Sequence, residues 1–138
     1  MGDRCHLRIT LRREDLKRFA PFLDKEPDQE WGDYSQAGEA DIVTVEVFEA
    51  NYALYDERHA AAQAGIPFLG QHGEGGEYGP YAFASLDGEM LEAPLSRDGE
   101  LILAVDRELQ PVGEVDGIRN YVAKLRAVEA LFGLKEAA

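Results

Sequence analysis

At 138 residues, the chain has the length of one domain and can bury a hydrophobic core without disulfides. The composition, 45% hydrophobic and 30% charged, excludes a disordered polymer, and the single cysteine, Cys5, excludes an internal disulfide or a paired-cysteine zinc site. The net charge of −13 is concentrated in residues 24–116, which hold twenty-two acids and four bases, whereas residues 1–23 and 117–138 have net charges of +3 and +2. Such a chain repels nucleic acid and anionic membranes, and attracts basic protein surfaces.

The location predicted from the sequence is cytoplasmic. The first eighteen residues contain six Lys or Arg and no apolar core, which does not fit a signal peptide. The longest clean aliphatic run, residues 101–105, is too short to span a bilayer.

The first half of the chain alternates predicted strands and helices. Residues 5–11 alternate apolar and polar side chains, as a half-buried strand does, and residues 16–23 have helical spacing that Pro21 should interrupt. Residues 24–41 read as a connection in which Trp31 and Tyr34 could contact the core. The β-branched run 42–48 predicts a strand, and an alanine-rich helix should follow over residues 54–64.

The second half predicts a run of hairpins and a closing helix. Strands are expected over residues 66–72, 78–86, 89–95 and 100–105, because turn sequences such as Asp87-Gly88 separate them. Apolar residues at helical spacing from Ile118 to Phe132 predict the last helix.

The predicted fold is a single α+β domain over residues 1–138. Its order is strand, helix, strand, helix, four strands, helix. Consecutive hairpins imply a mostly antiparallel sheet of about six strands, with the helices packed on one face.

The glycine-rich stretch 70–83 is a candidate functional loop. It lacks the Lys and Ser or Thr of a phosphate-binding loop and carries Glu74 and Glu77, which would repel a phosphate. His72 with these two glutamates could hold a metal ion or transfer protons, although the spacing matches no specific metal-site pattern. The remaining interpretations are a simple hairpin tip and a protein-binding loop.

A second candidate cluster lies where the second helix should begin, at Tyr52, Tyr55, Asp56 and Glu57. Acidic residues suit the positive end of a helix dipole, which is a purely structural explanation. The functional hypothesis is that Tyr52 and Tyr55 join Tyr78 in one aromatic and acidic patch.

These features predict a non-enzymatic protein-binding module that inhibits or regulates a basic partner, without a cofactor. Immunity proteins, nucleic-acid mimics and anti-CRISPR proteins share its small size, strong acidity and lack of a catalytic motif. The partner-binding residues predicted here are Tyr52, Tyr55, Asp56, Glu57, Glu74, Glu77 and Tyr78. The alternatives are a small metal- or ligand-binding enzyme built on His72, Glu74 and Glu77, and a subunit that forms a homodimer.

Overall fold

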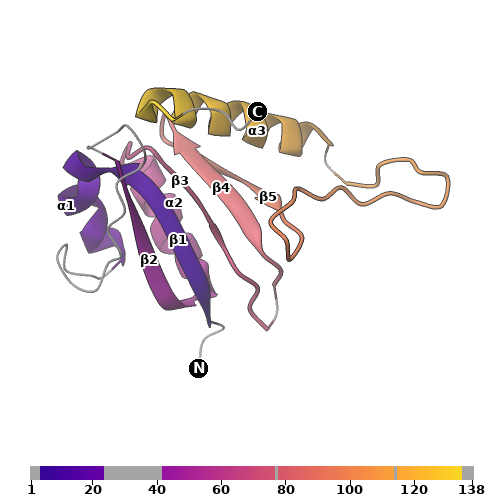
Figure 1. The fold of residues 1–138 in the computed structure, drawn as a ribbon, viewed down its shortest axis with the longest axis horizontal. Helices are drawn as coiled ribbons and strands as arrows, with labels where there is room; N and C mark the ends of the chain where they lie inside the picture. The colour runs from indigo at the N-terminus through magenta and orange to yellow at the C-terminus, as the bar shows by residue number, and fades with distance from the viewer. Residues whose placement is uncertain (1–3, 24–41, 77, 114, 135–138) are drawn as a thin grey trace.

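The computed structural model describes residues 4–23, 42–76, 78–113 and 115–134. Its centre is a five-stranded antiparallel sheet in the order β2-β1-β3-β4-β5, in which β1 lies between β2 and β3 (Figure 1). The strands are β1 (Arg4–Arg12), β2 (Ile42–Asn51), β3 (Phe68–His72), β4 (Tyr81–Leu86) and β5 (Glu89–Pro94). The α+β class and the antiparallel sheet predicted from the sequence are therefore confirmed.

One face of the sheet, which we call the α2 face, carries α1 (Leu16–Phe19) and α2 (Tyr55–Gln63). Two 3-10 turns flank α1, and the second contains Pro21, which accounts for the predicted interruption. Small side chains bring α2 close to the sheet, since Ala61 and Ala62 are buried among the strand residues of the same core cluster. The positive φ of Gly65 follows the end of this helix, as predicted for a helix stop.

The opposite face, the α3 face, carries α3 (Val115–Phe132), so the prediction that all helices share one face is wrong. The reason is visible in β4, where Phe83 belongs to the core cluster on the α2 face, whereas Ala82 and Ala84 pack with α3. A strand that is apolar on both faces needs cover on both. Neither α3 nor any other helix in the described ranges is long and apolar enough to cross a membrane.

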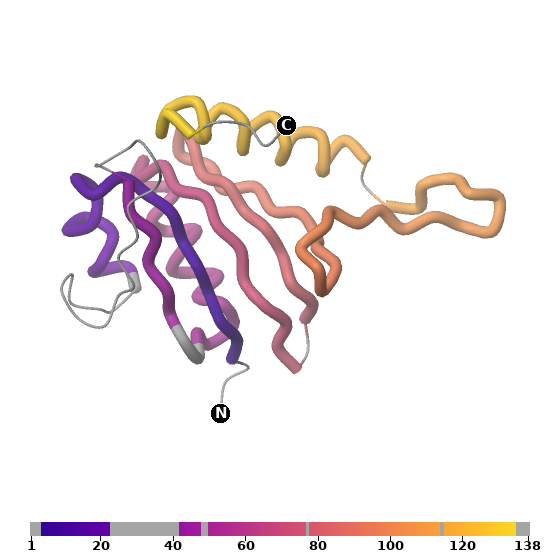
Figure 2. The backbone as a smooth tube through the Cα atoms, viewed as in Figure 1, coloured from indigo at the N-terminus to yellow at the C-terminus, as the bar shows by residue number. Residues whose placement is uncertain are grey.

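The predicted sixth strand, residues 100–105, is not part of the sheet. Only isolated bridges occur here, between Leu95 and Leu101 and between Val105 and Pro111. Residues 96–113 instead form an arm, of which the turn after β5 lies against the body and the remainder projects as a two-stranded ribbon beside the start of α3 (Figure 2). The segment folds back on itself at residues 106–110 rather than continuing along β5, so its apolar side chains lie outside the sheet.

Two turns of the same design shape the arm. In the first, the Ser96 hydroxyl accepts hydrogen bonds from the backbone N–H groups of Asp98 and Glu100. In the second, the Asp106 carboxylate accepts the equivalent bonds from Glu108 and Gln110. The position with positive φ is Gly99 in the first turn, at 84°, and Leu109 in the second, at 62°. A leucine in this left-handed region is strained, and it is also 77% exposed.

Replacing Leu109 with glycine is expected to tighten the end of the arm. Relief of left-handed strain outweighs the entropy that glycine adds to the open state by about 0.5–1 kcal/mol. Hydrogen exchange at the Val112 amide, which bonds the Ala104 carbonyl at 3.0 Å, should slow severalfold. Gly99→Leu is the reciprocal control, because it places leucine at the left-handed position of the first turn; it should speed hydrogen exchange in that turn. Unchanged hydrogen exchange in both variants would contradict the strain argument.

Candidate functional site

The α2 face holds an open pocket of about 500 Å³, which we call the tyrosine pocket. It is lined by the turn that follows β2, the first turn of α2, the loop before β4, and the strands β3, β4 and β5. The lining residues are Tyr52, Ala53, Tyr55, Asp56, Arg58, His72, Tyr78, Tyr81 and Glu92. Four tyrosines and two carboxylates thus surround one hollow.

A left-handed turn forms one wall of this pocket. Tyr52, Ala53 and Leu54 have φ values of 51°, 54° and 52°, although none of them is glycine. The left-handed conformation costs roughly 1–2 kcal/mol for each such residue, and strain of this kind gathers at functional sites. The turn presents the Tyr52 ring to the pocket rather than burying it, since Tyr52 is exposed.

Arg58 forms the pocket floor and is only 1% exposed. Its Nε donates to the Ala53 carbonyl at 2.8 Å and its Nη1 to the Glu92 carboxylate at 3.2 Å. The guanidinium lies over the Phe83 ring, 4.3 Å from its centroid. Burial lowers the pKa of Arg58, and the Glu92 carboxylate opposes that shift. Arg58 therefore fixes the left-handed turn to the sheet and has its charge balanced inside the protein.

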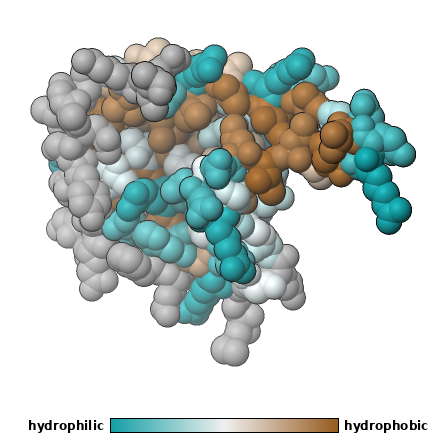
Figure 3. Space-filling model, turned by 45° about the vertical axis from the view of Figure 1, so that its right-hand side comes forward, coloured by the Kyte–Doolittle hydropathy of each residue, from teal (hydrophilic) through white to brown (hydrophobic). Residues whose placement is uncertain are grey.

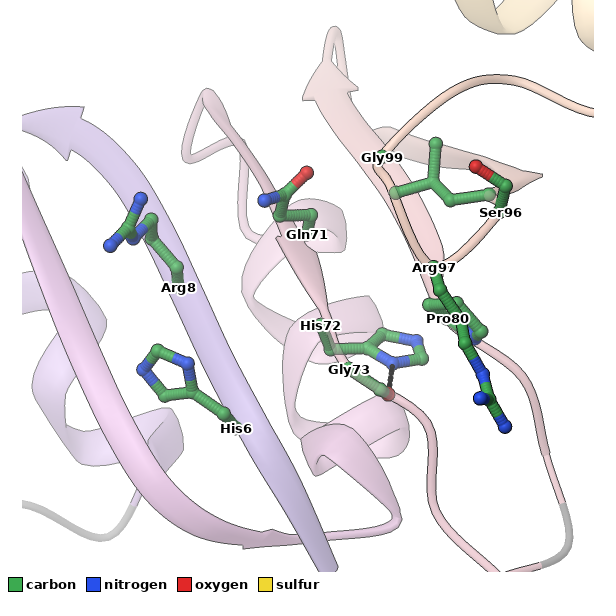
Figure 4. Close-up of a pocket in the computed structure, with 10 residues that line it drawn as sticks. His6, Arg8, Gln71, His72, Gly73, Pro80, Ser96, Arg97 and Gly99 are labelled. Carbon is green, nitrogen blue, oxygen red and sulfur yellow. Dashed lines mark hydrogen bonds between the residues drawn. The ribbon is translucent and has the colours of Figure 1, made fainter.

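His72, at the end of β3, is a buried neutral ring. Its Nδ1 donates to the Gly73 carbonyl at 2.7 Å, the bond drawn in Figure 4. This bond fixes the tautomer and leaves Nε2 as an acceptor. Burial lowers the pKa of His72, with the positive charge of Arg58 as a further cause in the same direction.

Aromatic rings form a continuous row along the pocket. Tyr52 and Tyr78 have ring centroids 6.4 Å apart, Tyr78 meets His72 edge-on at 5.6 Å, and His72 stacks on Tyr81 at 5.9 Å. The row joins the left-handed turn to the glycine-rich loop, two segments that are far apart in the sequence. The structure thus brings together Tyr52, Tyr55, Asp56 and Tyr78 of the predicted binding residues.

The other predicted residues lie elsewhere. Glu57 is half-buried in the first turn of α2 and does not line the pocket. Glu74 is exposed and lies 3.5 Å from Arg97 of the arm, and Glu77 falls outside the described residues. His72 lines the tyrosine pocket, whereas Glu74 does not and instead pairs with Arg97. In the described part of the chain, no group of three His, Cys, Asp or Glu residues is placed to hold a metal ion.

A second hollow, of about 250 Å³, opens next to His72 and is lined by His6, Arg8, Gln71 and Arg97 among others (Figure 4). Its basic groups are balanced locally. The Glu46 carboxylate lies 2.8 Å from Arg8 and 3.5 Å from His6, and Glu74 faces Arg97. This basic hollow therefore offers no uncompensated charge to a ligand, and the tyrosine pocket is the stronger candidate site.

The sequence analysis did not identify Arg58, Tyr81 and Glu92 as site residues. Arg58 stands in the polar sequence of α2 like a solvated helix residue, and Glu92 alternates with apolar neighbours like an exposed strand residue. One signal is present in the sequence: Arg58 and Lys25 are the only Lys or Arg residues between residues 19 and 96, so Arg58 is surrounded in sequence by carboxylates that could pair with it inside the protein.

The fold and the pocket define an α+β domain with a tyrosine-lined pocket. Comparisons with protein-family models, curated proteins and solved structures find no match to this chain. Its function is therefore argued from the site.

Proposed function

We propose that this protein is a non-enzymatic binding protein for a basic protein partner, and that the tyrosine pocket receives a lysine or arginine side chain of that partner. The observation that carries the proposal is the convergence of Tyr52, Tyr55 and Tyr78 with Asp56 on one open hollow. By covering a basic surface, the protein would act as a stoichiometric inhibitor or regulator. A reducing, cytoplasmic location agrees with the buried free thiol of Cys5.

The charges of the pocket favour a cation. Arg58 is compensated by Glu92, but among the described residues no cation pairs with Asp56, which is exposed. The site thus keeps one unbalanced negative charge. Aromatic faces attract ammonium and guanidinium groups by about 0.5–1 kcal/mol at exposed sites, and more where water is excluded. The net charge of −13 would speed the approach of a basic partner.

The proposal predicts that the pocket binds N-acetyl-arginine amide better than the uncharged N-acetyl-glutamine amide. Titrations followed by NMR shifts of the pocket amides would measure both. Tyr78→Ala and Asp56→Asn should each weaken the arginine probe roughly two- to fivefold, because one removes a ring face and the other the unbalanced charge.

The matched control is Asp87→Asn, which removes an exposed carboxylate at the β4–β5 turn. Its positive φ of 55° suits asparagine, so the turn should be retained. Equal loss of binding in this control, or equal binding of the two probes, would show that the pocket does not select a cation.

A second candidate function is the binding of a small neutral ligand. In the described ranges, Arg58 donates hydrogen bonds through Nε and Nη1, and its Nη2 donates none. Together with Nε2 of His72, it offers a donor and an acceptor to a polar, planar molecule held between tyrosine rings. Tight binding of an uncharged compound that Arg58→Lys abolishes would favour this alternative.

A further inference from the structure

The arm, residues 96–113, is the largest feature that the proposed function does not use. Of the nine exposed large hydrophobic residues in the described part of the chain, six lie on the arm, so this exposure is concentrated rather than scattered. They are Leu101, Ile102, Leu103, Val105, Leu109 and Val112. In Figure 3, apolar side chains cover the stem of the arm and continue onto the body, whereas the far end is hydrophilic.

A two-stranded ribbon of this kind is marginally stable in water by itself. Both turns of the arm are nonetheless closed by hydrogen bonds in which the backbone N–H groups of Glu100 and Gln110 donate to the Ser96 hydroxyl and the Asp106 carboxylate. The arm is therefore organised in advance and leaves its apolar stem uncovered. Contiguous exposed apolar surface on a folded protein often marks an interaction site.

A groove of about 350 Å³ lies at the base of the arm, which we call the arm groove. Ile102 and Leu103 of the stem form one side and Ile118 of α3 forms another. Tyr81 and Glu92 complete it, and both also line the tyrosine pocket. The two hollows therefore adjoin each other, with these two residues as a common wall.

The charges on the arm indicate what kind of segment would fill these two hollows. The arm carries four carboxylates, at Asp98, Glu100, Asp106 and Glu108, against the two bases Arg97 and Arg107. An apolar surface bordered by carboxylates fits an apolar surface bordered by bases. A second copy fits less well, because two chains of net charge −13 repel each other.

We infer that the arm groove and the tyrosine pocket together bind one segment of a basic protein partner, in which an apolar side chain occupies the groove and a neighbouring lysine or arginine enters the pocket. The inference rests on the proposed function, and it adds that the partner presents an apolar side chain next to its lysine or arginine. Tyr81 and Glu92 form the shared wall, so the two side chains would lie within a few residues on one extended chain.

The test uses dye-labelled peptides and fluorescence anisotropy. One set carries an arginine and a leucine one, two or three residues apart; the matched sets replace leucine with serine, or arginine with glutamine. The best-spaced arginine–leucine peptide should bind about five- to tenfold tighter than its serine partner, because leucine is removed from water. Leu103→Ala should abolish that advantage and leave the arginine dependence intact.

Leu131→Ala is the matched control, since Leu131 is an exposed leucine on α3 that does not line the groove. This variant should keep the leucine advantage. If leucine adds nothing, or if both variants lose it equally, the inference fails while the arginine dependence still supports the proposed function. If no peptide shows arginine dependence, both fail.

Sedimentation of the protein alone tests whether a second copy of the chain, rather than a basic partner, covers the arm. The inference expects a monomer over the concentration range of the binding assay. A dimer that Leu103→Ala dissociates would show that a second copy covers the arm, and would overturn the inference.

Discussion

Gly70→Ala is expected to destabilise the protein by at least about 3 kcal/mol, the upper range for inserting atoms into a packed core. A β-carbon at Gly70 would overlap the backbone carbonyl of Arg8 and lie 2.8 Å from Cζ of Phe83. Neither neighbour can move freely. β3 pairs with β1 on one side and β4 on the other, and Phe83 is fully buried beneath Arg58.

Urea denaturation followed by circular dichroism would measure this loss. Gly79→Ala is the control, because a β-carbon there meets nothing within 4 Å. That variant should stay within about 0.5 kcal/mol of the parent protein, as surface substitutions usually do. A Gly70→Ala protein as stable as the control would mean that β3 does not lie against β1 as described.

Arg58→Ala is the second substitution with a large expected effect, a loss of about 3–5 kcal/mol in the free energy of unfolding. The arginine is 1% exposed, and its removal leaves Glu92, whose side chain is 20% exposed, without its cation. The Ala53 carbonyl also loses the hydrogen bond that holds the left-handed turn. In both cases an acceptor loses the hydrogen bond that Arg58 donates to it, and an acceptor without its partner is costly in a buried environment.

A second variant separates the charge from the packing. Arg58→Met fills much of the same volume, and adding Glu92→Gln removes the uncompensated carboxylate, so the double variant should recover part of the stability. The pocket should nevertheless lose its shape, because the turn that presents Tyr52 is no longer fixed. If Arg58→Ala costs less than about 1 kcal/mol, the buried ion pair does not organise this site.

The two proposed recognition sites, the tyrosine pocket and the arm groove, share Tyr81 and Glu92. The tyrosine pocket supplies aromatic faces and a carboxylate, and the arm groove supplies apolar surface. The strained turn at Tyr52–Leu54 forms one wall of the tyrosine pocket, and the strained Leu109 lies on the arm. Strain in both places fits a surface shaped for a partner rather than for the stability of the isolated domain.

Local sequence determined most of the secondary structure. The β-branched run at 42–48 lies in β2, Pro21 lies in a 3-10 turn beside α1, and Gly65 and Gly133 follow the ends of α2 and α3 with positive φ. These features depend on neighbouring residues, on intrinsic backbone preferences and on the alternation of side chains, so they can be read from a short window.

The tertiary structure decided where α3 packs and where residues 100–105 lie. The alanines of β4 form a surface that α3 covers, and the apolar run from Leu101 to Val105, predicted as a strand, became the stem of the arm. Apolar periodicity indicates that a segment has a face to bury, but not which element covers it.

The tyrosine pocket, too, could be predicted only in part from the sequence. The sequence supplied the tyrosines and acids of two separate segments, and suggested that they could meet. Only the sheet register, which places His72 beside Tyr81 and Phe83 beside Glu92, and the burial of Arg58 formed them into one pocket. Contacts between residues so far apart in the chain depend on how the whole domain packs, and no local pattern in the sequence encodes them.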